Sequence, residues 1–143
     1  IGCGAGFPSL VLAIAFPRLK ITSIDSTGKK INFVNSAASE LGLKNIEGIQ
    51  GRACELNRKS NWIHRFDIIT ARAVGNSKML YNDTRNMVKK GGSHIFYKTP
   101  GQAESELPEL AAIPNGPSWK KTPEFVLPED AGTRLFIYSS AKS

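Results

Sequence analysis

Hydrophobic residues recur along this chain with the periods of regular secondary structure. Residues 27–41 carry them at three- and four-residue steps, the spacing of one face of a helix. The members of this face are Ile31, Val34, Ala38 and Leu41. Gly42 follows, where a helix-terminating glycine is common. An apolar helix is also predicted after the glycine-rich segment 2–6, ending near Phe16, because Pro17 cannot continue it.

Short β-type runs alternate with these helical patterns. The predicted strands cover residues 20–25, 46–50, 66–70 and 94–97, and a closing antiparallel pair covers 124–127 and 134–138. Further helices are predicted at 77–89, with Lys89 and Lys90 against its C-terminal dipole and Gly91 and Gly92 ending it, and at 102–112, interrupted by Pro108. Residues 51–65 are expected to be irregular. This alternation predicts an α/β fold with a mostly parallel sheet, helices on both faces and an antiparallel last strand.

Length and composition narrow the class of protein. The 143 residues suit one domain, and 41% hydrophobic with 22% charged residues is ordinary for a globular protein. No apolar run approaches the roughly 18 residues of a membrane span, so no membrane partner is expected. Cys3 and Cys54 are too few for a disulfide framework and lack the neighbours of a zinc site, which favours a reducing cytoplasm and no metal.

The net charge is positive. Nineteen Lys and Arg against twelve Asp and Glu give +7, which is typical of proteins that bind nucleic acid but also occurs in many that do not.

The segment Gly2-Cys3-Gly4-Ala5-Gly6 is a G-x-G-x-G loop at the start of a predicted helix. Glycines there let the backbone turn tightly and approach a ligand. Asp25 ends the next strand, where a carboxylate can accept hydrogen bonds from both hydroxyls of a ribose. Phe7 stands where a dinucleotide-binding G-x-G-x-x-G loop needs glycine, so S-adenosylmethionine is favoured over NAD. A tight packing turn and an NAD-dependent oxidoreductase remain as alternatives.

Three runs carry a resemblance to a known family. They are Gly2-Cys3-Gly4-Ala5-Gly6-Phe7-Pro8, Asp25-Ser26-Thr27-Gly28-Lys29-Lys30 and Phe66-Asp67-Ile68-Ile69-Thr70-Ala71-Arg72-Ala73. The chain resembles, over its whole length, the RsmG family of bacterial 16S rRNA guanine-N7 methyltransferases, formerly called glucose-inhibited division protein B (GidB). The resemblance implies a Rossmann-like class I fold, S-adenosyl-L-methionine as cofactor, and methylation of guanine N7 in the 530 loop of 16S rRNA. It also implies the small ribosomal subunit as partner and a monomeric enzyme.

The resemblance also assigns cofactor contacts. With the loop glycines, they are Gly2, Gly4, Gly6, Phe7, Asp25, Ala53, Cys54 and Arg72. Two positions depart from the family. Ser9 replaces a usual glycine, and Cys54 replaces a usual acidic residue, with Glu55 one position late. If that contact is made through the backbone the loss is mild, whereas a required carboxylate would lower cofactor affinity.

The chemistry explains why no catalytic acid, base or nucleophile is assigned. Guanine N7 has a free lone pair, so methyl transfer needs alignment and exclusion of water rather than a general base. Neither cysteine follows proline, as a cytosine-C5 methylase requires, and Thr70-Ala71-Arg72-Ala73 replaces the [DN]-P-P-[FY] of adenine amino methylases. Arg72 lies at the carboxyl end of a strand, where α/β proteins bind ligands, so we expect it to contact the ligand or the RNA, with a structural ion pair as the alternative.

Other residues receive weaker assignments. Candidate RNA contacts, with solvated surface side chains as the alternative, are Lys29, Lys30, Arg52, Lys98 and Arg134. Cys54 is expected to fill space, and both histidines and both tryptophans are expected to be structural. The acidic group of Glu104, Glu106 and Glu109 is predicted to form a solvated helix face away from RNA.

The start of the chain is unusual for this fold. Only Ile1 precedes the glycine loop, which normally follows the first strand. We therefore expect residues 1–143 to be a single methyltransferase domain without its first strand and without the family's N-terminal helical region. A non-catalytic or degenerate RNA-binding fragment is a further alternative.

Overall fold

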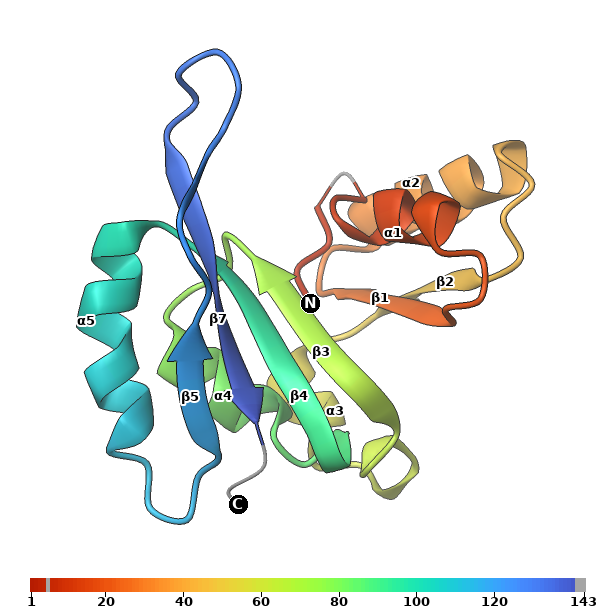
Figure 1. Ribbon diagram of the computed structural model, residues 1–143. Helices are drawn as coiled ribbons and strands as arrows, with labels where there is room; N and C mark the ends of the chain where they lie inside the picture. Colours follow the sequence, from red (N-terminus) through yellow and green to blue (C-terminus); the bar gives the residue numbers. More distant parts are fainter. Residues whose placement is uncertain (5, 141–143) are drawn as a thin grey trace. The chain divides into compact units, whose positions relative to one another are not determined.

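A computed structural model describes residues 1–4 and 6–140 of the chain (Figure 1). It divides into two compact units, the first ending at Leu56 and the second beginning at Asn57, and each is treated separately. The expectation of one domain stays a prediction. Within the described residues, no helix has the length and apolar character that crossing a membrane requires.

The first unit is a two-stranded parallel sheet with helices. Its elements are α1 (Ser9–Ala15), β1 (Ile21–Asp25), α2 (Gly28–Glu40), β2 (Ile46–Gln50) and α3 (Ala53–Leu56). β1 and β2 pair in parallel from Ile21 opposite Ile46 to Asp25 opposite Gln50. The two strands therefore end side by side, which brings Asp25 and the residues after Gln50 to one edge.

The helical period predicted for α2 is confirmed. Ile31, Val34 and Ala38 are buried together with Cys3 and Leu10. Leu41 is the exception, because α2 ends at Glu40 and the Leu41 side chain is 58% exposed.

Asn45 joins α1 to the strands. Its Nδ2 lies 3.1 Å from the carbonyl oxygen of Ala13, 3.4 Å from that of Phe16 and 3.1 Å from that of Leu19. One amide thus contacts carbonyl oxygens in the last turn of α1 and in the segment after it, and it holds the return of the chain into β1.

The second unit contains a five-stranded sheet. Its elements are η1 (Ser60–Trp62), β3 (Phe66–Arg72), α4 (Ser77–Thr84), β4 (Val88–Lys98), α5 (Pro100–Ala111), β5 (Ser118–Lys121), β6 (Phe125–Val126) and β7 (Thr133–Ser140). The main strand order is β3-β4-β7-β5, and β6 pairs with β7. β3 and β4 are parallel, whereas β7 runs antiparallel to β4, β5 and β6. The antiparallel last strand is therefore confirmed.

The core of this unit lies between the sheet and its helices. Leu135 and Ile137 of β7 pack with Tyr81 of α4 and with Ala103 and Leu110 of α5. α5 is continuous through Pro108, which corrects the predicted interruption, and a capping box of Thr99 and Gln102 begins it.

The predicted helix over 77–89 is wrong at its end. α4 stops at Thr84, and Val88 already belongs to β4. Met87 lies fully buried in the turn between the two elements, where its N–H donates to the Thr84 carbonyl oxygen at 2.9 Å. Gly91 and Gly92 occupy an irregularity of β4 rather than a helix end. Gly91 has φ +78°, and a Cβ on Gly92 would lie 2.6 Å from the carbonyl oxygen of Asp67. These glycines therefore serve a bulge in the strand.

Three elements were not predicted. α3 and η1 lie in the stretch expected to be irregular, and β5 was not expected at all. β5 pairs with β7, and Trp119 of β5 stacks on Phe96 of β4, with ring centroids 5.8 Å apart. Because these contacts are long-range, the local sequence pattern did not predict the strand.

Candidate functional site

The glycine loop has the backbone that only glycine adopts easily. Gly2, Gly4 and Gly6 have φ values of +65°, +50° and +88°. A Cβ on Gly6 would overlap the Leu10 side chain, whereas a Cβ on Gly4 would meet no described heavy atom within 4 Å. Gly6 is thus required by packing, and Gly4 borders open space. Ala5 lies outside the described residues.

The Asp25 carboxylate lies beneath this loop. Its Oδ2 accepts the Gly4 N–H at 3.3 Å, and its Oδ1 accepts the Thr27 N–H at 2.9 Å. Burial raises the pKa of Asp25, but these N–H groups and the charge of Lys30 outweigh it and hold the pKa below its usual value. The carboxylate is therefore ionised at neutral pH and ties the glycine loop to the end of β1.

A hollow opens beside Asp25. It has a volume of about 390 Å³ and is lined by Ser26, Gln50, Gly51, Arg52 and Glu55. The Gly51 N–H donates to the Asp25 carbonyl oxygen at 2.9 Å, and Gln50 Nε2 donates to the Ser26 carbonyl oxygen at 3.2 Å. The carboxyl ends of β1 and β2 form this hollow, as expected of ligand sites in parallel sheets.

The predicted contacts Ala53 and Cys54 open the short helix α3 next to this hollow. Both are partly buried. Glu55 in the first turn of α3 lines the hollow itself, so a carboxylate is present although Cys54 occupies the family's acidic position. Sequence reasoning did not assign Glu55, Ser26 or Gln50. The pairing of Asp25 with Gln50 was the signal that could have found Gln50.

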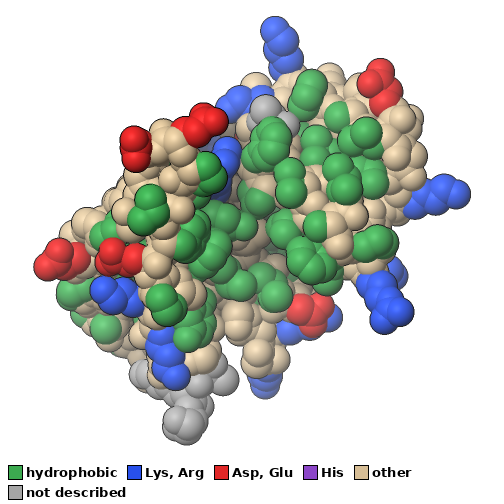
Figure 2. Space-filling model, turned by 45° about the horizontal axis from the view of Figure 1, so that its top comes forward, with side chains coloured by type: hydrophobic (Ala, Val, Ile, Leu, Met, Phe, Trp, Pro, Cys, Tyr) green, Lys and Arg blue, Asp and Glu red, His purple; other side chains and the backbone are tan. Residues whose placement is uncertain are grey.

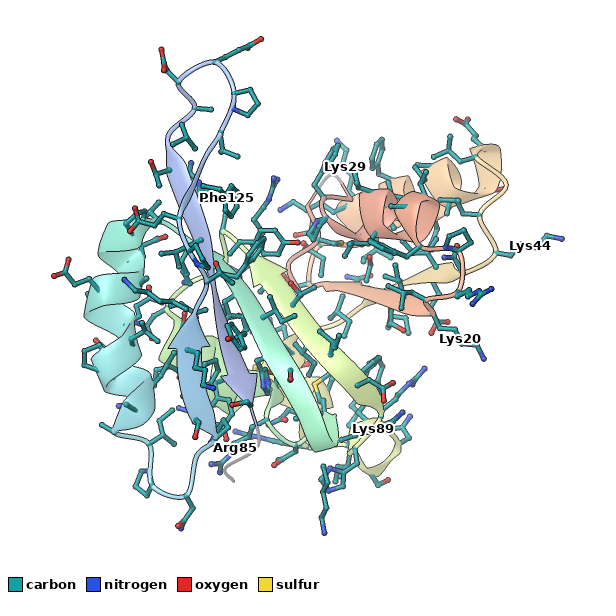
Figure 3. All side chains as sticks on the ribbon, viewed as in Figure 1. Lys20, Lys29, Lys44, Arg85, Lys89 and Phe125 are labelled. Atoms are coloured by element: carbon teal, nitrogen blue, oxygen red, sulfur yellow. The ribbon has the colours of Figure 1, made fainter. Side chains whose placement is uncertain are left out.

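The remaining predicted residues of the first unit lie at its surface. Phe7 is 51% exposed, Lys29 and Lys30 are exposed in the first turn of α2, and Arg52 is exposed at the hollow (Figure 3 labels Lys29). Val11, Ile14 and Phe16 of the same unit are exposed hydrophobic residues as well. Figure 2 shows hydrophobic side chains gathered on the surface of this unit.

Arg72 belongs to the second unit. It is the last residue of β3, it is exposed, and it pairs with Tyr97 of β4. Burial raises the pKa of Tyr97, while the charge of Arg72 and a side-chain hydrogen bond to Thr70 act against the rise. Arg72 therefore lies at the carboxyl end of the strand, as the sequence predicted, with an aromatic neighbour. Arg134 of β7 is partly buried, and its Nη1 donates to the carbonyl oxygen of Thr133 at 2.9 Å.

Lys98 has a different environment from the exposed one that RNA contact requires. Its side chain is 5% exposed, and its Nζ lies 3.0 Å from Glu106 Oε2 and 3.0 Å from the Gly75 carbonyl oxygen. Glu106 also accepts both the N–H and the hydroxyl of Ser77. The solvated acidic face predicted for α5 is thus wrong at Glu106, because the helical period groups it with Ala103 and Leu110 on the buried face.

Glu106 is a buried anion. Burial raises its pKa, but the bonds from Ser77 and Lys98 outweigh this and leave the pKa below its usual value. Because the pair bonds to Gly75 and Ser77, it fixes the loop that follows Arg72. Lys98 and Glu106 therefore have a structural role at the edge where Arg72 lies.

The histidines are structural, as predicted. His94 is buried, its Nε2 lies 3.0 Å from Thr84 Oγ1, and burial lowers its pKa from 6.5 to about 4. His64 Nδ1 lies 3.0 Å from the Val88 carbonyl oxygen. Both contacts join segments of the second unit to each other.

Comparison with known sequences identifies relatives. The family model "GidB: rRNA small subunit methyltransferase G" matches residues 1–116. A protein of Staphylococcus epidermidis named ribosomal RNA small subunit methyltransferase G is 42% identical over 139 residues, covering 96% of this chain and 57% of the relative. The protein of that name from Staphylococcus aureus strain Newman is 42% identical, with 96% and 58% covered. The chain thus spans somewhat more than half the length of these relatives.

Comparison with solved structures establishes the fold. An rRNA methylase from Streptococcus thermophilus matches with a TM-score of 0.64 and 12% identity, covering 98% of this chain and 83% of that one. A SAM dependent methyltransferase from Aquifex aeolicus matches with a TM-score of 0.67 and 15% identity, covering 99% and 79%. The predicted Rossmann-like class I methyltransferase fold is therefore confirmed.

Proposed function

The chain belongs to the rRNA small subunit methyltransferase G (GidB) family, and we propose that it carries the cofactor site of a 16S rRNA guanine-N7 methyltransferase. The observation that supports this most directly is the Asp25 carboxylate under the Gly4 backbone, beside a hollow at the carboxyl ends of two parallel strands. The oxidoreductase alternative is not favoured, because the family and the similar structures are methyltransferases.

The residues fit an adenosine-containing cofactor. A carboxylate can accept about four hydrogen bonds, and Asp25 receives two from backbone N–H groups and one from the Thr27 side chain, which leaves capacity for a ribose hydroxyl. Gly4 borders open space, so the backbone can approach a ligand closely. Ser26, Gln50 and Glu55 offer polar groups in the hollow to the edge of a base.

Bound S-adenosyl-L-methionine supplies an electrophilic methyl group. This chain then binds the cofactor and orients the reactants. The glycine loop and Asp25 hold the nucleoside, and Arg72 at the end of β3 positions the ligand or the RNA. No proton has to leave guanine N7, so the reaction needs no general base. The two histidines fit this mechanism, because His94 is bonded to Thr84 and His64 to the Val88 carbonyl oxygen, and neither has to act as a base.

The same proposal includes the substrate, the partner and the contact residues. The substrate is guanine in the 530 loop of 16S rRNA, presented on the small ribosomal subunit to a cytoplasmic, monomeric enzyme. Ala53 and Cys54 contact the cofactor through the start of α3, and Lys29, Lys30, Arg52 and Arg134 are candidates for RNA phosphates.

The decisive experiment is calorimetric titration of the chain with S-adenosylhomocysteine. We expect micromolar binding that Asp25→Asn abolishes and that Glu40→Gln, an exposed carboxylate of the same unit, leaves unchanged. Methyl transfer to unmodified small subunits, with N7-methylguanine located by borohydride and aniline cleavage, then tests the substrate. Binding of NADH instead, or equal binding by Asp25→Asn, would refute the proposed site.

A further inference from the structure

Positive charge is unevenly distributed along the second unit. Residues 57–92 contain eight Lys and Arg against two Asp, whereas residues 99–130 contain two Lys against six Asp and Glu. Six of the basic residues are exposed and flank the amino ends of β3 and β4: Arg58, Lys59, Arg65, Arg85, Lys89 and Lys90. We call this set the amino-end basic patch.

Hydrogen bonds bring the segments of this patch together. Asn57 Oδ1 accepts the Asn86 N–H at 2.9 Å, which places Arg58 and Arg85 on neighbouring stretches of backbone. The Arg65 N–H donates to the Met87 carbonyl oxygen at 2.9 Å, which ties the start of β3 to the segment before β4. Figure 3 shows Arg85 and Lys89 at the same end of this unit.

Asn57 makes this junction rigid. Its side chain is buried, and besides the bond to Asn86 its Nδ2 donates to the Asn82 carbonyl oxygen at 3.2 Å. The backbone that carries Arg58 and Arg85 is therefore held in place when the protein is free. A fixed array of cations loses little conformational freedom when it binds a polyanion.

Aromatic rings constrain the central cation. The Arg65 guanidinium carbon lies 4.7 Å from the centroid of the Trp62 ring and 5.5 Å from that of Phe66. Stacking of this kind limits the rotation of the guanidinium. Lys89 is held by Asp67, with Nζ–Oδ1 2.9 Å, but both side chains are well exposed, so a phosphate can compete for the lysine at little cost.

We propose that the amino-end basic patch binds the phosphate backbone of the RNA substrate, at the opposite end of β3 from Arg72. The inference rests on the proposed rRNA substrate. β3 has seven residues, so its amino end lies about 20 Å from Arg72 at roughly 3.3 Å a residue. That span corresponds to several nucleotides, and the patch therefore acts as an anchor that positions the RNA without reading bases.

Fluorescence anisotropy with a fluorescein-labelled single-stranded RNA tests the anchor at several salt concentrations. Lys59→Gln/Lys90→Gln removes two cations of the patch, and Lys120→Gln/Lys121→Gln removes two exposed cations from β5 as a charge-matched control. Single-stranded RNA contributes a salt slope of about 0.7 per phosphate contact, so the first variant should weaken binding and reduce the slope by about 1.4. The control should reduce it by less than half as much.

A gain-of-function variant makes the test two-sided. Asp67→Asn removes the anion that engages Lys89, so RNA binding should tighten and the salt slope should rise. Equal losses in the two double variants would overturn the anchor and leave only an effect of net charge. No tightening in Asp67→Asn would also overturn it, because Lys89 would then make no contact with RNA.

Titration with S-adenosylhomocysteine separates this outcome from failure of the proposed function. All three variants should bind it like the parent chain. If the parent chain does not bind it, the methyltransferase proposal fails, while the comparison of RNA slopes still decides whether the patch is an RNA site.

Discussion

The ammonium of Lys98 lies 3.0 Å from the carboxylate of Glu106, and their side chains are 5% and 10% exposed. The pair closes the end of β4 against α5 and bonds to the loop between Arg72 and α4 through Gly75 and Ser77. An ion pair so deeply buried cannot lose one member cheaply, because the other is left as an uncompensated charge.

Removal of one charge should therefore destabilise the second unit strongly. We expect Glu106→Gln to lower the free energy of unfolding by about 3 kcal/mol. Glu104→Gln on the exposed face of the same helix should change it by less than about 0.5 kcal/mol. Urea denaturation followed by circular dichroism measures both, and similar values for the two variants would contradict the role given to Glu106.

Protonation of His94 should make stability depend on pH. Its pKa is about 4 in the folded protein against 6.5 ordinarily, so between these values the unfolded chain binds a proton that the folded protein excludes. Stability should be unaffected by His94 above pH 6.5 and should fall as the pH drops toward 4, by up to about 1.4 kcal/mol per pH unit. His94→Gln should flatten this window in urea titrations, and the exposed-site variant His64→Asn should retain it.

Asp25 and Glu106 act in a lower pH range. The pKa of each is held below its usual value of 3.8 or 4.5, so the stability they contribute is fully present above those values. It is lost as the pH falls through the lower folded-state pKa of each group. Acid unfolding of Glu106→Gln should therefore be less steep below pH 4.5 than that of the parent chain, and an identical acid limb would argue against an ionised Glu106.

The spacing of hydrophobic residues predicted much of the fold, because it reflects which side chains are buried. Ile31, Val34 and Ala38 recur with the helical period, and they face one core. The same reasoning failed where distant contacts decide: Met87 is fully buried before β4, and β5 pairs with β7 while its Trp119 stacks on Phe96. The charge of Glu106 predicts a solvated side chain, but its position beside Ala103 and Leu110 buries it, and its partner Lys98 lies outside the helix.

The residues of the candidate site also fall into those that the sequence predicts and those that it does not. The glycine loop and Asp25 are recognisable in sequence because their residue types and order are demanded by backbone geometry. Glu55 and Gln50 reach the hollow through the parallel pairing of β1 with β2, which the sequence does not record residue by residue.

Asn45 should contribute to the stability of the first unit, although no sequence pattern singles it out. Asn45→Ala removes donors from the carbonyl oxygens of Ala13, Phe16 and Leu19, so we expect a loss of about 2 kcal/mol. Thermal unfolding measures the loss, and the exposed Asn61→Ala serves as control. A loss no larger than that of the control would mean that water replaces these bonds.

Two glycines of the loop should separate folding from cofactor binding. Gly6→Ala combines φ +88° with overlap on Leu10, so it should impair folding itself. Gly4→Ala adds a methyl group into open space, so its cost should be the left-handed backbone alone, about 1–2 kcal/mol. If the cofactor approaches the loop there, the same methyl group should reduce S-adenosylhomocysteine affinity by at least about tenfold while the chain stays folded. Calorimetry on the folded Gly4→Ala variant measures this, and unchanged affinity would place the cofactor away from Gly4 because a ligand in contact with that backbone cannot avoid the added carbon.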